Sequence, residues 1–235
     1  MRAAAAFVFD VRFQWRHGFY FVYMIVCAIY WALLHFIPEP YLEKATVLLT
    51  FSDPSALGLI LAGGIVLLER DQGIHDPLFI TPIRIREYLV AKAASLALIS
   101  LLAAWVIQLS SIGIPASPMI FSIGIVLTSS FMTLLSIGVA ARYRTINSFI
   151  LMSQVYVMPF ILPLLDYLEV WESKLFLLLP TEGTLMLLLS VSFSLTSMNI
   201  LYALCILSIW NYAVYKWAYR SYERHILNRI GKGAL

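Results

Sequence analysis

Long apolar stretches follow one another along this chain of 235 residues. An α-helix needs about 20 apolar residues to cross the hydrocarbon of a bilayer, and residues 19–37 and 118–141 reach that length without Asp, Glu, Lys or Arg. Only 12% of all residues are charged, whereas soluble domains carry about 25%. The sequence therefore predicts an all-α membrane protein in which lipid replaces much of the core of a soluble fold.

Helix-start and helix-stop signals divide the chain into six predicted transmembrane helices. Pro38-Glu39-Pro40 ends the first one. Asp53 followed by Pro54 has the pattern of an N-cap with proline at the first helical position, so the second should start at Pro54. Pro159 and Pro163 fall inside the fifth and should kink it. The predicted spans are residues 19–37, 54–72, 88–109, 118–141, 146–165 and 198–218.

Residues 2–18 precede the first span and have a mixed pattern. Four apolar residues share one face at helical spacing: Phe7, Val8, Val11 and Trp15. Arg12 and Arg16 flank that face. We expect an amphipathic elbow helix at the membrane interface, with a simple N-terminal extension of the first span as the alternative.

Residues 175–193 precede the sixth span and contain two apolar pieces, separated by Pro180-Thr181-Glu182-Gly183. Each piece is too short to cross the membrane. The pattern therefore predicts a re-entrant or interfacial hairpin on the outer side.

The basic residues indicate the orientation in the membrane. Of the 16 Lys and Arg residues, 14 lie before the first span, between spans two and three, between spans four and five, or after the last span. Only Lys44 and Lys174 lie in segments on the other side. Because cytoplasmic loops are enriched in Lys and Arg, we expect a multi-pass protein of the plasma (inner) membrane with both termini in the cytoplasm.

The chain lacks the motifs that carry common chemistries. It has no G-x-x-x-x-G-K-[ST] loop to hold ATP phosphates and no HExxH, CxxC or GxSxG motif. A net charge of +3 gives no reason to expect nucleic acid. Few ionisable residues lie deep in the spans, which argues against an ion-coupled carrier. A possible substrate path follows Gln154, Pro159 and Phe160. For Gln154 the alternative, which we favour, is a plain hydrogen bond between helices.

The segment 69–87, between spans two and three, is far more polar than its flanks. Asp76-Pro77 and Thr81-Pro82 are two further helix-start signals, which predict a short helix over 77–80 and a long helix from Pro82. Between them Leu78-Phe79-Ile80 forms an apolar knob. Such a knob in a polar rim suits a protein-docking surface; the alternative is that it dips into the lipid interface.

This segment resembles the corresponding loop of type-2 ATP-binding-cassette (ABC) export permeases, above all the small bacterial drug and antibiotic exporters. The resemblance rests on Glu69, Gly73, Leu78, Thr81-Pro82, Glu87-Tyr88 and Lys92. It implies that the loop contacts a separate ATPase subunit, which binds ATP and Mg, so that this chain holds no cofactor. It also implies pairing with a second permease chain, either an identical copy or a sister permease.

The resemblance makes the loop the coupling segment to the ATPase, with Glu69, Gly73, Asp76, Leu78, Phe79, Ile80 and Pro82 as its residues. Glu69 is expected to pair with Arg142 or Arg144, or with the partner chain's counterpart of Arg70. The expected function is the permease subunit of an exporter for a hydrophobic or amphipathic substrate, such as a drug, an antibiotic peptide or a lipid. The alternatives are a membrane enzyme using Asp53, Glu182 or His35, and a non-transporting immunity or scaffold protein.

Overall fold

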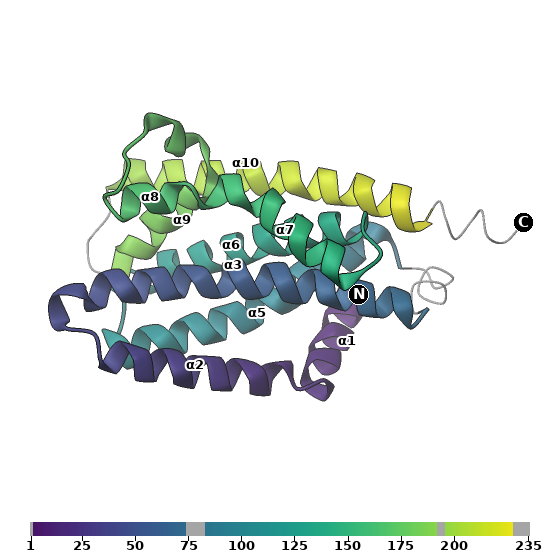
Figure 1. Ribbon diagram of the computed structural model, residues 1–235, viewed down its shortest axis with the longest axis horizontal. Helices are drawn as coiled ribbons and strands as arrows, with labels where there is room; N and C mark the ends of the chain where they lie inside the picture. The colour runs from purple at the N-terminus through teal and green to yellow at the C-terminus, as the bar shows by residue number, and fades with distance from the viewer. Residues whose placement is uncertain (1, 74–82, 192–195, 228–235) are drawn as a thin grey trace, which may run out of the picture.

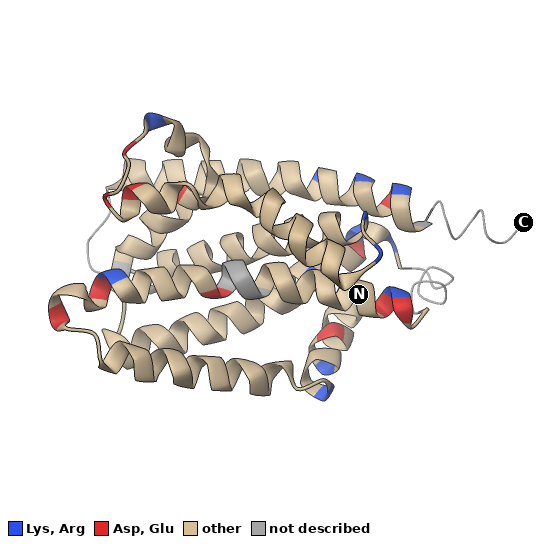
Figure 2. Cartoon of the chain, viewed as in Figure 1, with Lys and Arg blue, Asp and Glu red and all other residues tan. Residues whose placement is uncertain are grey.

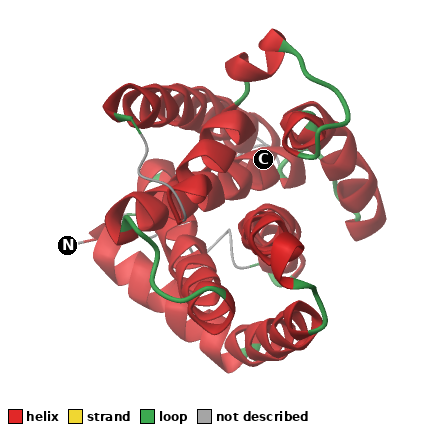
Figure 3. Cartoon of the chain, turned by 90° about the vertical axis from the view of Figure 1, so that its left-hand side faces the viewer, coloured by secondary structure: helices red, strands yellow, loops and turns green. Residues whose placement is uncertain are grey.

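The structure is a computed structural model that describes residues 2–73, 83–191 and 196–227. Within these ranges the regular elements are helices, and no strand is present (Figure 3). The main helices are α1 (Arg2–Arg16), α2 (Phe19–His35), α3 (Glu39–Asp71), α5 (Ile85–Ser111), α6 (Pro118–Ala140), α7 (Ile146–Ile161), α8 (Pro163–Tyr167), α9 (Pro180–Leu188) and α10 (Ser197–Tyr222). Three short helical turns complete them: η1 (Lys174–Leu178), η2 (Leu189–Val191) and η3 (Glu223–Leu227). The predicted all-α fold is confirmed.

The long helices α2, α3, α5, α6 and α10 run along the long axis of the molecule (Figure 1). Helix α6 lies between α3, α5 and α10 and packs against all three. Its side chains Phe131, Met132 and Ile137 are almost fully buried and form the centre of the core with neighbours from α3 and α7. Apolar side chains from several helices therefore enclose α6, while α10 exposes most of its surface.

Four helical segments are long and apolar enough to cross a membrane: α3, α5, α6 and residues Ser197–Ile226. A fifth arises if α1 and α2, which meet at a bend of 65°, are taken together as one broken span. Helix α7 has 16 residues. A multi-pass, all-α membrane protein fits these lengths, and the count of six spans stays a prediction.

Charged residues gather at the two ends of the bundle, and its middle is largely uncharged apart from a single acidic residue of α3, Asp53 (Figure 2). We call the end that holds Arg70, Arg84, Arg142 and Arg220 the basic end; the described parts of the chain begin and end toward it (Figure 1). The opposite end holds Glu39, Glu43, Glu169 and Glu172 and is called the acidic end. The basic residues that are separated in the sequence therefore do gather in space.

Helix α3 differs from the predicted second span. It runs for 33 residues without interruption, so Asp53 lies inside the helix and not at its N-cap. A proline within a helix loses one hydrogen bond and clashes with the preceding turn, at a cost of about 3 kcal/mol. Val47, Phe51 and Leu59 are buried on either side of this point, and their packing holds the helix together across the proline.

The predicted kink of the fifth span lies at Pro163. Helix α7 continues through Pro159 and ends at Ile161, and Pro163 begins the separate helix α8. Proline at the first helical position costs little, because its missing N–H would have no partner there. The outer half of this span is thus broken, as expected, four residues beyond the first of the two prolines.

The segment before α10 folds inward as η1, α9 and η2. Thr184, Leu185 and Leu187 of α9 are buried, and α9 packs against α6 and α10. The two pieces are separate helices, since η1 ends at Leu178 and α9 begins at Pro180, but residues 180–183 form the first turn of α9 and not the loop that was predicted between them. A Cβ on Gly183 would lie 2.7 Å from the Ile206 side chain of α10, so this glycine permits close helix packing.

The predicted elbow is present as α1, which is joined to α2 through Gly18 with φ of +74°. The residues of α1 buried against the bundle are the polar Asp10 and Gln14, whereas Val8 and Trp15 are exposed. Of the apolar face predicted from the sequence, Val8 and Trp15 therefore point away from the protein, whereas Phe7 and Val11 are half-buried. The exposed part of the face suits the interfacial position expected from the pattern.

Candidate functional site

The predicted coupling segment begins at the basic end of α3. Glu69 belongs to the last turn of that helix, and Gly73 follows it in the left-handed conformation, with φ of +64°. The other predicted coupling residues, Asp76, Leu78, Phe79, Ile80 and Pro82, lie outside the described residues. The short helix over 77–80 therefore stays a prediction, and the geometry of the site is built from Glu69 and its surroundings.

Glu69 belongs to a buried ion cluster with Asp10 and Lys92. The Lys92 Nζ atom lies 2.5 Å from Glu69 Oε1 and 2.8 Å from Asp10 Oδ1. Lys92 is 1% exposed, Glu69 3% and Asp10 5%. One ammonium group thus joins a carboxylate of α1 to a carboxylate of α3 from its position on α5.

Hydrogen bonds extend this ion cluster. The Tyr88 hydroxyl donates to Glu69 Oε2 at 2.5 Å, and the Tyr88 ring packs against Tyr222 of α10 with ring centres 5.2 Å apart. Next to them the Gln14 amide of α1 donates to the Ser95 hydroxyl of α5 at 3.0 Å. Four helices, α1, α3, α5 and α10, therefore meet at the point where α3 passes into the coupling segment.

The electrostatics of the cluster make it a structural link between helices, and the loss of any one of its three charged side chains would be costly. Two carboxylates and one ammonium carry a formal charge of −1, and all three are removed from solvent. Burial of a charge is costly unless it is paired and hydrogen-bonded, so each member depends on the others. A displacement of the end of α3 would therefore move α1 and α5 with it.

The arginines of the basic end have other partners than expected. The Arg70 guanidinium donates to the backbone carbonyls of Tyr143 and Ala141, at 2.8 and 3.1 Å. The Arg142 guanidinium donates to the Ser221 hydroxyl at 3.0 Å and lies over the Trp217 ring. The partner that the structure shows for Glu69 is Lys92, two turns into α5 and almost fully buried, which the sequence reasoning did not name. Pairing of Glu69 with the partner chain's counterpart of Arg70 stays a prediction.

Asp10 was missed by the sequence reasoning. It is the only Asp or Glu before Glu39, and it is located four residues before Gln14, so both lie on one face of α1. A lone acidic residue in a basic amphipathic helix, together with a lysine inside a predicted span, was the available signal. Asp10 and Lys92 are 82 positions apart in the sequence, and only the fold shows that they are in contact.

At the acidic end a second ion pair joins α3 to the loop after α8. Lys44 Nζ lies 2.8 Å from Glu169 Oε1. The hydrogen bond from Lys44 and its positive charge lower the pKa of Glu169 below its usual value. This pair is exposed to solvent, so it contributes less than the buried cluster.

The predicted substrate path is only partly assembled. Gln154 of α7 lines an apolar cavity of about 390 Å³ between α3 and α7, together with Phe51, Leu59, Val157 and Ile161. Gln154 is exposed on α7, and both interpretations of this residue, as part of a substrate path and as a hydrogen bond between helices, stay predictions.

The other two predicted path residues are placed differently. Phe160 does not line this cavity; its ring packs edge-on against Phe131 and Trp210, at 5.1 Å from each. Pro159 is exposed on α7. Phe160 is thus part of the aromatic core between α6, α7 and α10, and Gln154 alone represents the predicted path.

The amino-acid sequence of this chain is similar to those of known proteins. A family model described as the fluoroquinolones export permease protein family matches residues 1–230. The chain belongs to this family. Two relatives, the fluoroquinolones export permease proteins of Mycobacterium tuberculosis strains CDC 1551 / Oshkosh and H37Rv, are each 26% identical over 191 residues, which cover 80% of this chain and 79% of each relative.

Membership of the family accounts for the general features of the chain. It is an export permease by family, and its apolar helices and buried, charge-poor middle are those of a multi-pass membrane protein. The resemblance found in the segment 69–92 is confirmed at the level of the family. The matched region includes both α1, with Asp10, and the complete coupling segment.

Proposed function

We propose that this chain is the transmembrane subunit of an ATP-driven exporter and that it moves a hydrophobic or amphipathic substrate out of the cytoplasm. A separate ABC ATPase subunit would bind and hydrolyse ATP with Mg, and this chain would do no catalysis. Two permease chains would pair in the plasma membrane, with their basic ends in the cytoplasm. The ATPase would act on the coupling segment 69–87.

The buried ion cluster is the observation that carries this proposal. It lies at the end of α3, directly before the coupling segment, and ties α3 to α1 and α5 through Lys92. A displacement of the coupling segment would be passed to α1 and α5 through this ion cluster. The cavity beside Gln154 lies along the same helix α3 and is lined mainly by apolar side chains, which suits a hydrophobic substrate.

The test of ATPase docking uses Phe79→Ala. Loss of a buried interface anchor costs about 2 kcal/mol or more, so the complex with the ATPase should weaken by an order of magnitude or so, measured by co-purification and titration. Leu109→Ala is the control, because Leu109 is an exposed apolar residue at the opposite end of α5. Normal ATPase binding and export by Phe79→Ala would instead support a loop that dips into the lipid interface.

The test of transmission uses Glu69→Gln. Glutamine keeps a hydrogen-bond acceptor for Lys92 but removes the charge, so the ATPase should still bind while substrate-stimulated ATP hydrolysis falls. Glu223→Gln is the matched control, because Glu223 is exposed at the same end of the bundle. Unchanged stimulation in Glu69→Gln would show that the cluster does not transmit the signal.

A further inference from the structure

A groove between the start of α5 and the second half of α10 lies at the basic end of the bundle. Its volume is about 350 Å³. Arg86 of α5 lines one side of the groove, and five residues of α10 line the other: Tyr212, Tyr215, Lys216, Tyr219 and Arg220. These five positions have the i, i+3, i+4, i+7, i+8 spacing of one helix face. The groove is therefore a regular surface of α10 closed on one side by α5.

The lining of this α5–α10 groove carries positive charge only. Arg86, Lys216 and Arg220 are all exposed, and basic residues mark this end of α10 in Figure 2. Among the described residues no carboxylate pairs with any of the three. A cleft lined by one sign of charge attracts ligands of the opposite sign, so the groove is suited to an anion.

The tyrosine rings of the groove hold two of its cations in place. The Lys216 Nζ atom lies 4.5 Å from the centre of the Tyr212 ring, and the Arg86 guanidinium lies 5.9 Å from the centre of the Tyr219 ring. A cation–π contact positions a side chain without neutralising its charge. Tyrosine is also enriched where membrane helices pass from hydrocarbon to headgroups, so the rings indicate that the groove lies at headgroup level.

Apolar side chains follow the groove on both helices. Val90, one turn after Arg86 on α5, is 53% exposed, and Ile209, three residues before Tyr212 on α10, is 62% exposed. Both lie farther from the basic end than the charged residues of the same helix. A ligand with an anionic head and long apolar chains would therefore meet matching surfaces along its whole length.

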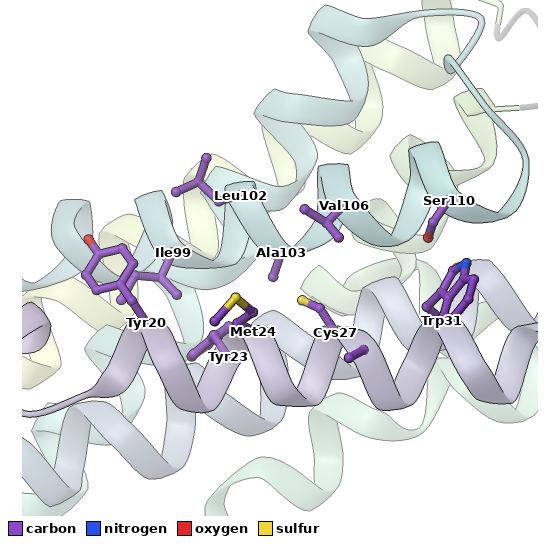
Figure 4. Close-up of a pocket in the computed structure, with 11 residues that line it drawn as sticks. Tyr20, Tyr23, Met24, Cys27, Trp31, Ile99, Leu102, Ala103, Val106 and Ser110 are labelled. Atoms are coloured by element: carbon purple, nitrogen blue, oxygen red, sulfur yellow. The ribbon is translucent and has the colours of Figure 1, made fainter.

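The groove between α2 and α5 in Figure 4 offers no such selection. Tyr20 lies near one end of that groove and Trp31 near the other, with Met24 and Cys27 between them. Its lining contains no Lys, Arg, Asp or Glu. Charge complementarity can identify an occupant for the α5–α10 groove, and it identifies none for the α2–α5 groove.

We propose that the α5–α10 groove binds an anionic phospholipid from the leaflet next to the basic end. The phosphate oxygens accept hydrogen bonds from Arg86, Lys216 and Arg220, and the acyl chains lie along Val90 and Ile209. Charge-assisted hydrogen bonds to phosphate are strong, and basic pockets between membrane helices suit acidic headgroups. A soluble phosphate compound would satisfy the same charges but would leave the apolar side chains uncovered. This site does not depend on the ATP-driven export proposed above.

The experiment measures lipid binding to the full chain without the ATPase. The chain in dodecyl maltoside is titrated with phosphatidylglycerol that carries a fluorescent label on one acyl chain, and fluorescence anisotropy reports binding. Unlabelled phosphatidylglycerol should displace the labelled lipid. Phosphatidylcholine with the same chains lacks the net negative charge, and glycerol 3-phosphate lacks the chains, so each should be at least about tenfold less effective.

Variants of the groove test the role of its charges. Arg86→Gln, Lys216→Gln and Arg220→Gln together should weaken binding of the labelled lipid at least about tenfold, and Lys216→Gln alone about fivefold. The single variant decides the question if the triple variant does not fold, which circular dichroism checks. Arg86→Lys with Arg220→Lys keeps both charges and should retain most of the affinity.

A second triple variant controls for the general positive charge of the molecule. Arg16→Gln, Arg144→Gln and Arg224→Gln remove three exposed charges outside the groove, and the lipid affinity should change by less than about twofold. Equal loss of affinity in the two triple variants, or no binding of phosphatidylglycerol, would overturn the proposal. Displacement by phosphatidylcholine or by glycerol 3-phosphate as effective as by phosphatidylglycerol would overturn it too. None of these results touches the Phe79 and Glu69 tests of export.

Discussion

Replacement of Lys92 by methionine tests how strongly the buried cluster holds the basic end together. Methionine fills a similar volume and removes the ammonium group that lies between Glu69 and Asp10. Two carboxylates that are 3% and 5% exposed would then face each other without the ammonium group that lies between them. Removal of one partner from a buried ion pair costs about 3–5 kcal/mol, and here both acidic residues depend on the same lysine.

The expected effect is large enough to measure by thermal unfolding. For chains of 150–250 residues a loss of 1 kcal/mol lowers the midpoint by about 2–4 °C, so Lys92→Met should unfold about 10 °C lower than the unmodified chain. The assay is a thermal scan of the purified chain in detergent, followed by circular dichroism. Lys44→Met is the control, because Lys44 forms an exposed pair with Glu169, and its midpoint should stay close to that of the parent.

A triple variant separates the loss of the charge pair from the loss of the side chain. Asp10→Asn, Glu69→Gln and Lys92→Met together remove all three charges, so no charge is left buried alone. Because replacement of a complete buried ion pair by neutral groups is often nearly neutral, the triple variant should recover most of the lost stability. If Lys92→Met unfolds like the parent, or if the triple variant is less stable than the single one, the cluster does not act as described.

Three further results are expected. Gly138→Ala should destabilise the chain by about 1–3 kcal/mol in chemical denaturation, because its Cβ would lie 2.1 Å from the Trp217 ring; Gly64→Ala, whose Cβ would meet nothing within 4 Å, should be tolerated, and equal losses would contradict the packing of α6 on α10. The Lys44–Glu169 pair should stabilise the acidic end at neutral pH and lose that contribution as the pH falls through the lowered pKa of Glu169; Glu169→Gln should abolish this acid-dependent step in a pH series of melts, and a step that persists would point to another group. Single cysteines at Glu43 and Glu172, in a chain with Cys27→Ala and Cys205→Ala, should react with a membrane-impermeant thiol reagent in intact cells, and one at Gln72 should not; labelling at Gln72 would reverse the orientation.

The sequence by itself determined the class of the fold. Helical apolar stretches and a low charge content leave few alternatives to a helical membrane protein, because a backbone in lipid must satisfy its hydrogen bonds within each helix. The local proline signal at Pro38 placed the end of α2 within a few residues, and Pro163 marked the break between α7 and α8. The pattern from Glu69 to Lys92 was enough to indicate the family that the comparison confirmed.

The tertiary structure decided which of these local signals counted. The Asp53-Pro54 signal for a helix start was overridden, since packing on both sides of α3 outweighs the cost of one proline. The partner of Glu69 was decided in the same way. A carboxylate at the end of a helix has several arginines within reach along the sequence, but only the packing of α1 against α5 brings Asp10 and Lys92 to it. Burial and partnership depend on contacts between distant segments, and for that reason the ion cluster of Asp10, Glu69 and Lys92 appears only in the folded chain.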